Sequence, residues 1–256
     1  MTSRRVAIVV PVRNERDAVE PLFGKFAAAL TEIGDGVTIF VVDGLSTDGT
    51  LDEVRRVAAR LPVEIVRLKE NVGLGGAVDV GLRKGLALAD AIVTLDGDDS
   101  HDPRAIPALL TRLDEGYDVV VASRFAPGGK EVGVAPHRRL MSHAAGALLR
   151  LLFPMGEVRD YSSGFRAYRS SALERVRDAY DGIVDEQGFS CMLELLLRLR
   201  SQGARAAEVP LVLRYDLKRS ESKMEVGRTI LRYFRLIGRH FGSPRRIPES
   251  VNAAGG

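Results

Sequence analysis

Ala91-Ile-Val-Thr-Leu-Asp-Gly-Asp-Asp-Ser100 runs from a mostly apolar, β-branched segment directly into a cluster of acids. The first part, from Ala91 to Leu95, predicts a short strand that is buried on both faces. Such strands are typical of parallel sheets covered by helices on both sides. Because residues i and i+2 of an extended segment face the same side, Asp96 and Asp98 present two carboxylates together.

The chain on both sides of this segment alternates short apolar runs with helical patterns. We predict strands at 6–10, 37–42, 63–68, 91–95, 117–122 and 208–213, and helices at 18–30, 51–61, 76–88, 103–114, 138–153, 189–201 and 226–241. This rhythm predicts an α/β fold in which a mixed, mostly parallel sheet is flanked by helices. Ligands of such sheets bind beyond the carboxyl ends of the strands, where the polar clusters of this chain fall.

Composition indicates a soluble globular protein with one main domain. The chain has 256 residues, of which 45% are hydrophobic and 28% are charged, which allows one large core. The single cysteine, Cys191, cannot form an internal disulfide, and no secretory leader opens the sequence, so we expect a cytoplasmic protein. No uninterrupted apolar run reaches the roughly 18 residues that a membrane span needs.

The acidic cluster is the strongest local signal for chemistry. Asp96 and Asp98 can bind one hard divalent cation, Mg²⁺ or Mn²⁺, and Ser100 is a candidate for a third ligand. Such an ion would bridge two phosphates and neutralise the charge of a departing nucleotide. The structural alternative is an acidic turn that caps the helix beginning at Pro103.

Three further polar clusters follow predicted strands. Asp43 ends the second strand and can hydrogen-bond a base or a ribose, and the segment from Pro11 to Glu15 follows the first strand and can line the same crevice. The segment from Asn71 to Ala77 opens a helix whose amide groups can face phosphate. Ordinary strand-to-helix loops are the structural alternative for each cluster.

In their order and spacing, these motifs resemble family 2 glycosyltransferases of the GT-A fold, and most of all the polyprenyl- or dolichyl-phosphate mannose synthases. The matching segments are Pro11 to Glu15, Asp43, Asp96-Gly97-Asp98, Ser123-Arg124, Gly128-Gly129, Arg138-Arg139-Leu-Met-Ser142, Ser163-Gly164-Phe165-Arg166 and the basic loop 218–223. The resemblance covers nearly all of residues 4–224 and implies a Rossmann-like GT-A catalytic domain over 1–224.

The resemblance also implies roles for individual residues. The implied donor-binding residues are Pro11, Arg13, Asn14, Glu15, Asp43, Gly75, Asp96, Gly97, Asp98, Arg214 and Lys223, and the implied metal ligands are Asp96, Asp98 and Ser100. The implied acceptor-binding residues are Arg124, Arg139, Ser142 and Ser222. Among all of these, Asp98, Arg124, Arg139 and Ser142 are the implied catalytic residues.

The implied reaction is an inverting, metal-dependent transfer of a sugar from GDP-mannose or a UDP-hexose to a polyprenyl or dolichyl phosphate. A lipid phosphate is already anionic at neutral pH, so its attack needs positioning and charge neutralisation rather than a strong base. The alternative is a hydroxyl acceptor with Asp185 or Glu186 as the general base. A membrane-surface scaffold without activity is the third reading.

Cationic residues crowd the last quarter of the chain, which favours anionic partners. Over 225–245 we predict a basic amphipathic helix, with arginines on one face and Ile230, Phe234, Ile237 and Phe241 on the other. This helix either lies in a membrane interface or packs on the domain, and both readings stay open. We expect peripheral association with the cytoplasmic face of a membrane, no nucleic-acid partner, and a flexible tail over 246–256; a small membrane partner or a homo-oligomer stays open.

Three other residues receive structural interpretations. Arg166 is a candidate for a structural ion pair with Asp160 and is not assigned a catalytic role. Glu194 is assigned to helix packing, and Cys191 is assigned as an inert residue of the core.

Overall fold

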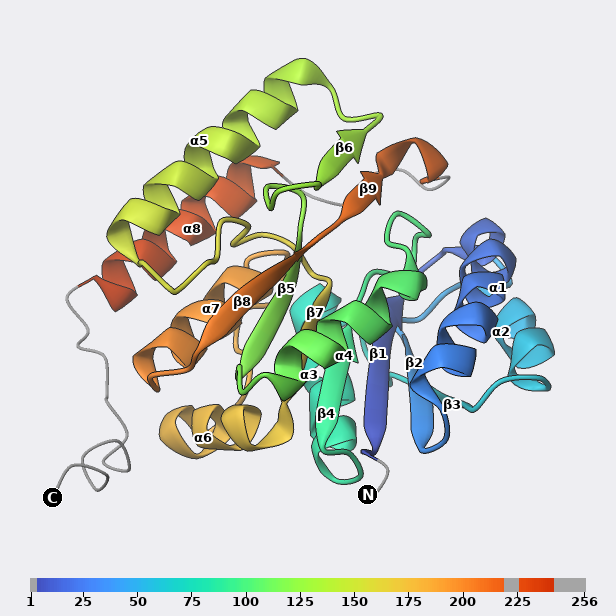
Figure 1. The fold of residues 1–256 in the computed structure, drawn as a ribbon. Coiled ribbons are helices and arrows are strands. Elements are labelled where there is room, and N and C mark those ends of the chain that lie inside the picture. The colour runs from blue at the N-terminus through green and yellow to red at the C-terminus, as the bar shows by residue number, and fades with distance from the viewer. Residues whose placement is uncertain (1–3, 219–225, 242–256) are drawn as a thin grey trace, which may run out of the picture.

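The computed structural model describes residues 4–218 and 226–241 (Figure 1). Seven strands form one sheet in the order β3-β2-β1-β4-β7-β5-β8. They are β1 (Val6–Val12), β2 (Val37–Asp43), β3 (Val63–Arg67), β4 (Ala91–Thr94), β5 (Val119–Ser123), β7 (Arg166–Arg169) and β8 (Ala206–Pro210). Only β7 runs antiparallel to its neighbours β4 and β5 among these paired strands, so the predicted mixed, mostly parallel sheet is confirmed.

Helices cover both faces of this sheet. They are α1 (Arg16–Ile33), α2 (Thr50–Ala58), α3 (Gly73–Leu86), α4 (Ile106–Asp114), α6 (Ser170–Tyr180) and α7 (Cys191–Ser201). Alternate residues of β1 belong to two different cores: Ala7 and Val9 pack with α3, α6 and α7, whereas Ile8 and Val10 pack with α1 and α4. The two-residue period of a strand therefore divides one apolar run between two cores.

A second region lies beyond the carboxyl ends of the parallel strands, at the top of Figure 1. It contains β6 (Lys130–Val132), β9 (Val212–Arg214) and α5 (Pro136–Leu152), and β6 pairs with β9 in a separate two-stranded sheet. The last described helix, α8 (Val226–His240), buries Leu236 and packs Tyr233 and Ile237 against the core. Within the described ranges, every helix is too short or too polar to cross a bilayer.

Strands β6 and β7 were not predicted, and two further parts of the chain differ from the predicted elements. The single strand predicted at 208–213 is divided at Pro210, because β8 ends there in the main sheet and β9 begins at Val212 in the small one. Proline has no N–H to continue a ladder, and the next amide, that of Leu211, donates to the Ser123 carbonyl. Helix α6 was not predicted, although Ala172, Leu173 and Val176 bury one face of it.

Some predicted residues lie outside the described ranges. They are Ser222 and Lys223, which were assigned to the acceptor and the donor, and the predicted tail 246–256.

Helix α3 packs so closely on the sheet that adding one carbon at Gly81 is predicted to destabilise the fold. A Cβ added at Gly81 would lie 2.2 Å from Cγ1 of Val9, whereas a Cβ at Gly24 of α1 would meet nothing within 4 Å. We expect Gly81→Ala to lower the free energy of unfolding by about 1–3 kcal/mol through overpacking. As the matched control, Gly24→Ala should be neutral or raise it by up to about 1 kcal/mol. Urea unfolding measures both, and equal effects of the two changes would contradict the close approach.

Candidate active site

Three neighbouring strands end in polar loops at one edge of the sheet. Val12 at the end of β1 is in register with Asp43 at the end of β2, and β4 lies on the other side of β1. Each following loop holds a non-glycine residue with positive φ: 52° at Asn14, 65° at Leu45 and 64° at Asp99. Such conformations are costly and concentrate in functional loops. The predicted clusters after these strands therefore meet at one edge.

The loops after β1 and β2 are tied together around a buried acid. The Asn14 amide donates to Oγ of Ser46 at 2.9 Å, and its side-chain oxygen accepts from the Thr47 amide at 2.8 Å. Asp43 is fully buried, and its Oδ1 accepts from the Ser46 amide. Its Oδ2 finds no hydrogen-bond donor among the described residues, and Nε of Arg67 is 3.8 Å away. A buried oxygen without a donor is suited to bind a ligand hydroxyl or N–H.

Other predicted donor-binding residues lie in and near the loops after β1 and β4. A Cβ at Gly97 would lie 2.8 Å from the Pro11 carbonyl oxygen, so the absence of a side chain lets the acidic loop close on β1. Arg13 lies beside Gly44, where an added Cβ would be 3.5 Å from Cβ of Arg13. The Glu15 amide donates to Oγ1 of Thr50. Pro11 to Glu15, Asp43 and Gly97 thus share one edge of the sheet; their ligand contacts stay a prediction.

The Asp98 carboxylate is bound on both oxygens. Oδ1 accepts from the amide and the hydroxyl of Ser100, and Oδ2 accepts from Nζ of Lys218 at 2.6 Å. Burial alone would raise the pKa of Asp98, but the charge and hydrogen bond of Lys218 hold it below its usual range. For Asp96, burial raises the pKa against the opposing effect of His101, and Asp98 adds to the rise. The His101 ring nitrogen Nδ1 accepts from the Asp96 amide.

The donor set of this loop fits a hard divalent cation that arrives with its substrate. Among the described residues, no three His, Cys, Asp or Glu side chains form a cluster that could hold a metal on their own. Mg²⁺ commonly takes one or two protein carboxylates and fills its other positions with substrate phosphates and water. Asp96 and Asp98 match that chemistry. Ser100 gives its hydroxyl proton to Asp98, which places it beside the carboxylate as a support.

A cluster of opposite charge lies past the end of β5. Arg124 donates to Asp160 through Nε at 2.8 Å and through Nη2 at 3.0 Å, and to Glu131 through Nη1 at 3.0 Å. Asp160 is fully buried, which would raise its pKa, but Arg124 holds that pKa below its usual range. On α5, Nε of Arg139 is 3.4 Å from Glu131, and Ser142 follows about one turn later. Predicted acceptor residues from two elements therefore converge around Glu131.

The structure corrects the assignment of Arg166. Its guanidinium is fully buried and donates to the carbonyls of Met192 and Tyr161, at 2.6 and 2.8 Å. The predicted ion pair with Asp160 is wrong, because Arg124 takes that carboxylate. Backbone carbonyls supply acceptors that a sequence pattern does not reveal.

Glu194 does more than pack a helix, so that interpretation is also wrong. Its buried carboxylate accepts from the amides of Asp185 and Glu186 and pairs with Arg198 at 2.8 Å. Glu194 therefore holds the loop between α6 and α7. Cys191 is buried, and burial raises its thiol pKa to about 12, in keeping with an inert core residue.

The same loop covers the start of α3. The Gly75 amide donates to the Gln187 carbonyl at 3.0 Å, and a Cβ at Gly75 would lie 1.7 Å from the Glu186 carbonyl oxygen. Gly75 thus has a packing role and an amide partner within the chain. Its contact with a donor phosphate stays a prediction.

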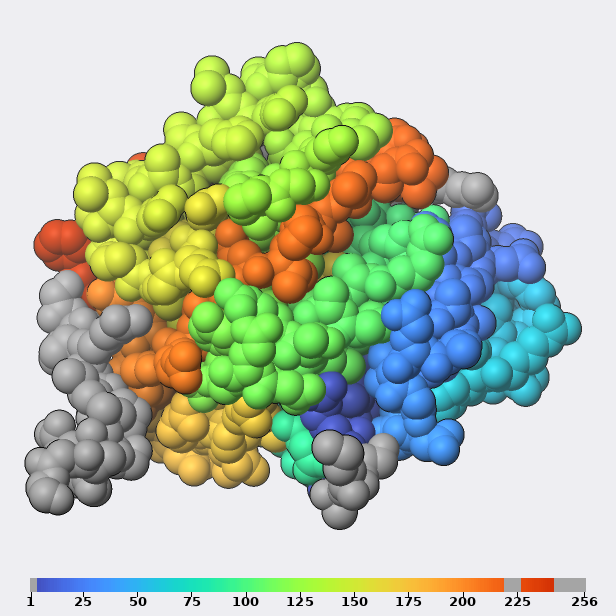
Figure 2. All heavy atoms as spheres, in the orientation of Figure 1, coloured from blue at the N-terminus to red at the C-terminus, as the bar shows by residue number. Residues whose placement is uncertain are grey.

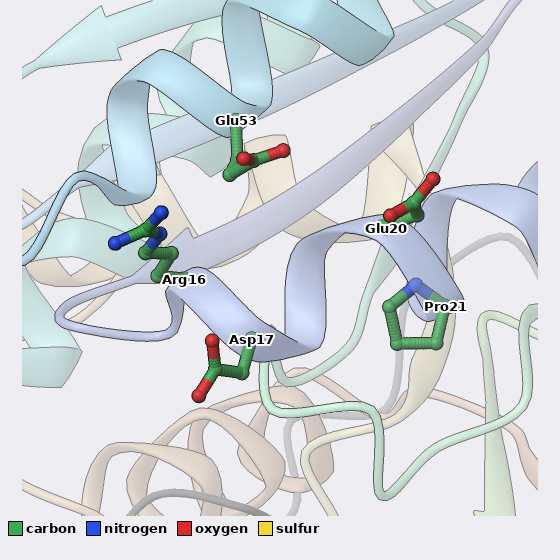
Figure 3. A pocket seen from close by; sticks show the side chains of 5 residues that line it. All are labelled: Arg16, Asp17, Glu20, Pro21 and Glu53. Atoms are coloured by element: carbon green, nitrogen blue, oxygen red, sulfur yellow. The ribbon is translucent and has the colours of Figure 1, made fainter.

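Two hollows open on the surface near these loops. Figure 3 shows one between α1 and α2, lined by Arg16, Asp17, Glu20, Pro21 and Glu53, and none of these is a predicted site residue. The other borders the acidic loop and is lined in part by Asp99, Ser100 and Arg214. There the Arg214 amide donates to the Ser100 carbonyl, and its guanidinium pairs with Asp216. This second hollow adjoins the carboxylates of the candidate site.

The sequence profile of the family named Glycosyl transferase family 2 matches residues 7–177. This chain belongs to that family. Three relatives are similar over most of this chain. "Dolichol-phosphate mannosyltransferase" of Pyrococcus furiosus is 32% identical over 92% of this chain, and "Undecaprenyl-phosphate mannosyltransferase" of Micrococcus luteus is 32% identical over 87% of it. "Polyprenol monophosphomannose synthase" of Mycolicibacterium smegmatis is 33% identical over 82% of this chain. The matched regions span 63%, 88% and 77% of these relatives.

Solved structures share the architecture of this family 2 chain. Glucosyl-3-phosphoglycerate synthase of Mycobacterium tuberculosis, in complex with Mn²⁺, UDP and glucosyl-3-phosphoglycerate, superposes with a TM-score of 0.69 at 23% identity. The match covers 94% of this chain and 81% of the other. The likeness confirms the predicted GT-A type of α/β fold.

The buried pair of Arg124 and Asp160 predicts how stability depends on pH. Because the folded-state pKa of Asp160 lies below its unfolded value, ionised Asp160 stabilises the fold above the ordinary pKa of about 3.9, and this contribution is lost as pH falls through the folded pKa. Asp160→Asn should therefore cost about 3 kcal/mol at pH 7 and make stability less dependent on pH below about 5.

Urea unfolding at pH 7, 5, 4 and 3 measures this effect. Asp52→Asn is the control, because the Asp52 side chain is 80% exposed. If the Asp160 variant and the wild type lose stability in parallel as pH falls, the ion pair does not stabilise the fold as described.

Proposed function

We propose that this chain transfers a sugar from a nucleotide-sugar donor, GDP-mannose or a UDP-hexose, to a polyprenyl or dolichyl phosphate. The transfer inverts the anomeric carbon and depends on Mg²⁺ or Mn²⁺. The observation that carries the proposal is the placement of two clusters beyond the carboxyl ends of parallel strands of one sheet. The acids Asp96 and Asp98 follow β4, and the arginines Arg124 and Arg139 gather past the end of β5, with β7 between these two strands. The names of the three relatives support the acceptor class, and Mn²⁺ and UDP in the Mycobacterium tuberculosis enzyme support the metal and the donor class.

On the donor side, the loops after β1, β2 and β4 bind the nucleotide sugar. Asp43, whose buried Oδ2 has no hydrogen-bond donor among the described residues, takes a hydrogen bond from the base or ribose, and Asn14 and Glu15 line the same edge. Asp96 and Asp98 would hold the cation, which would supply positive charge against the leaving diphosphate. Arg214 and Lys223 are the proposed basic contacts from the segment after β8.

On the acceptor side, a phosphate oxygen attacks the anomeric carbon as the bond from that carbon to the diphosphate breaks. Attack from the face opposite the leaving group gives inversion. Arg139, Ser142 and Ser222 bind the acceptor phosphate, and Arg124 contributes a guanidinium whose direction is fixed by Asp160. Because the attacking oxygen is already anionic, no base has to remove a proton.

A hydroxyl acceptor would need a base, and the two candidate acids are already engaged. Asp185 pairs with Arg198, and Glu186 accepts a hydrogen bond from the Ser190 hydroxyl at 2.6 Å. Each acid therefore has a contact within the chain on one of its oxygens. We place the phosphate acceptor before the hydroxyl acceptor because a phosphate needs no base.

Two helices expose apolar side chains that suit a membrane interface. On α5 these are Leu140, Met141, Leu148 and Leu151, and on α8 they are Ile230, Leu231 and Phe234, followed by Phe241. Helix α5 forms the upper left surface of the molecule in Figure 2. Because α8 also packs on the core through Leu236, we propose that 225–245 is anchored to the catalytic domain 1–224 and seats it on the cytoplasmic face of a membrane.

Charge substitutions on these helices test the membrane surface. Leu151→Glu and Phe234→Glu should each weaken binding to vesicles of phosphatidylglycerol and phosphatidylcholine, because each removes an exposed apolar contact and adds a negative charge. Leu88→Glu is the control, since Leu88 is 50% exposed at the opposite edge of the sheet. Co-sedimentation measures binding, and equal binding by all variants would exclude α5 and α8 as the contact surface.

The proposed reaction is tested with GDP-mannose or UDP-glucose, Mn²⁺ and a short polyprenyl phosphate, with labelled lipid as the readout. Asp98→Ala should lower kcat/KM at least about 100-fold and remove its dependence on metal. Arg139→Ala should raise KM for the acceptor by about tenfold or more while KM for the donor stays constant.

Arg55→Ala is the matched control for Arg139, because the two arginines are 59% and 60% exposed. Absence of transfer from every donor tried would refute the proposed function. A normal acceptor KM in Arg139→Ala would refute the acceptor role of Arg139 alone.

A further inference from the structure

One carboxylate stands in the middle of the proposed acceptor arginines. The Glu131 side chain, on β6, is only 3% exposed. Its Oε1 accepts from Nη1 of Arg124 at 3.0 Å, and its Oε2 lies 3.4 Å from Nε of Arg139 and 3.9 Å from Nε2 of His143. Oε2 is buried and has no hydrogen-bond donor among the described residues. Three basic side chains from two elements therefore face one acid.

Phosphate and carboxylate compete for the same recognition groups. Arginine binds both through two N–H groups, and the anion makes charge-assisted hydrogen bonds that are stronger than neutral ones. An acceptor phosphate bound by Arg124 and Arg139 would have to contact the guanidinium N–H groups that now face Glu131. Oε2, which has no hydrogen-bond donor among the described residues, adds to the conflict, because a phosphate oxygen beside it would meet a second negative charge.

In the cluster formed by Arg124, Arg139, Asp160 and Glu131, positive and negative charges are equal in number when no ligand is bound. Asp160 takes two N–H groups of Arg124 and neutralises it, so Glu131 is the counter-charge of Arg139. Two arginines are matched by two buried acids. A phosphate that entered beside both acids would bring unbalanced negative charge into a desolvated site, which is costly.

The strand that carries Glu131 is held outside the main sheet. Strand β6 has three residues, and among the described strands its partner is β9. Gly128 and Gly133 flank it, with φ of 91° and 77°. A displacement of Glu131 would therefore not have to break the hydrogen bonds of the seven-stranded sheet.

We propose that Glu131 is a counter-ion that the acceptor phosphate displaces: it holds Arg124 and Arg139 in the place of the phosphate and so lowers the affinity of the site for every phosphate. This inference rests on the proposed phosphate acceptor. A lipid phosphate also gains apolar contacts with the exposed side chains of α5, such as Leu140, and free phosphate has no such contacts. The lipid therefore sets the ratio of the two affinities, and Glu131 lowers both, so that free phosphate leaves the site empty at concentrations where lipid phosphate still binds.

Direct binding tests this role without turnover. Isothermal titration of inorganic phosphate and of citronellyl phosphate compares the wild type with Glu131→Gln, which keeps the shape and removes the charge. We expect Glu131→Gln to bind both anions about tenfold more tightly or better. Glu157→Gln is the control, because Glu157 is an exposed acid that pairs with Arg112. Unchanged or weaker binding of both anions by Glu131→Gln would overturn the proposal.

A double variant tests whether the gain comes from the released arginine. In the Arg139→Ala background, Glu131→Gln should improve phosphate binding by a smaller factor than in the wild type, because one of the two freed guanidiniums is missing. An equal factor in both backgrounds would contradict competition for Arg139. Glu131→Asp, which keeps the charge on a shorter side chain, should stay closer to the wild type than to Glu131→Gln. Circular dichroism and thermal unfolding verify that all variants are folded.

Kinetics separate this proposal from the proposed function. With citronellyl phosphate as acceptor, Glu131→Gln should lower the acceptor KM by about tenfold and keep kcat within about twofold. Loss of kcat with unchanged phosphate binding would make Glu131 a base and overturn its role as a displaced counter-ion. If the wild type transfers no sugar to citronellyl phosphate, the proposed function fails, while the binding measurements still decide whether Glu131 competes with phosphate.

Discussion

The parallel pairing of β1 with both β2 and β4 is the constraint on which the candidate site depends. It brings the loops after three separate strands to one edge, so that Asn14, Asp43 and Asp98 are neighbours although they are far apart in sequence. The apolar residues of β1 fix this arrangement, because they are buried in two cores on opposite faces of the sheet. Glycines without room for a Cβ, such as Gly81 and Gly97, let the helix and the acidic loop approach β1 closely.

The antiparallel strand β7 adds the second half of the site. Because β7 lies between β4 and β5, the segment before it passes the end of β5 and delivers Asp160 to Arg124. The carboxyl edge thus carries acids on the β1 side and arginines on the β5 side. A donor with a diphosphate and a cation suits the first half, and an anionic acceptor suits the second.

The sequence predicted those structural features that depend on residues close together in the chain. The strands of the first half and the pair Asp96 and Asp98 follow from apolar runs and from the two-residue period of a strand. The missed features join distant positions: Lys218 reaches Asp98 across 120 residues, and Arg124 reaches Asp160 across 36. Glu131 alternates with its neighbours like an ordinary edge residue, and the sequence does not reveal that Arg124, Arg139 and His143 surround its buried carboxylate. The family resemblance identified Arg124 and Arg139, but it did not identify Asp160 and Glu131 as the acids that bind them.

In each half of the site, a side chain of the protein already supplies a charge of the same sign as the proposed ligand. Lys218 provides a cation at Asp98, and Glu131 provides an anion at Arg124 and Arg139. Burial explains why such partners are present, since an unpaired charge in a desolvated site destabilises the fold. It follows that ligand binding at either half exchanges one ion pair for another. The net affinity is then a small difference between two strong interactions, and contacts outside the charged groups decide which ligand is retained.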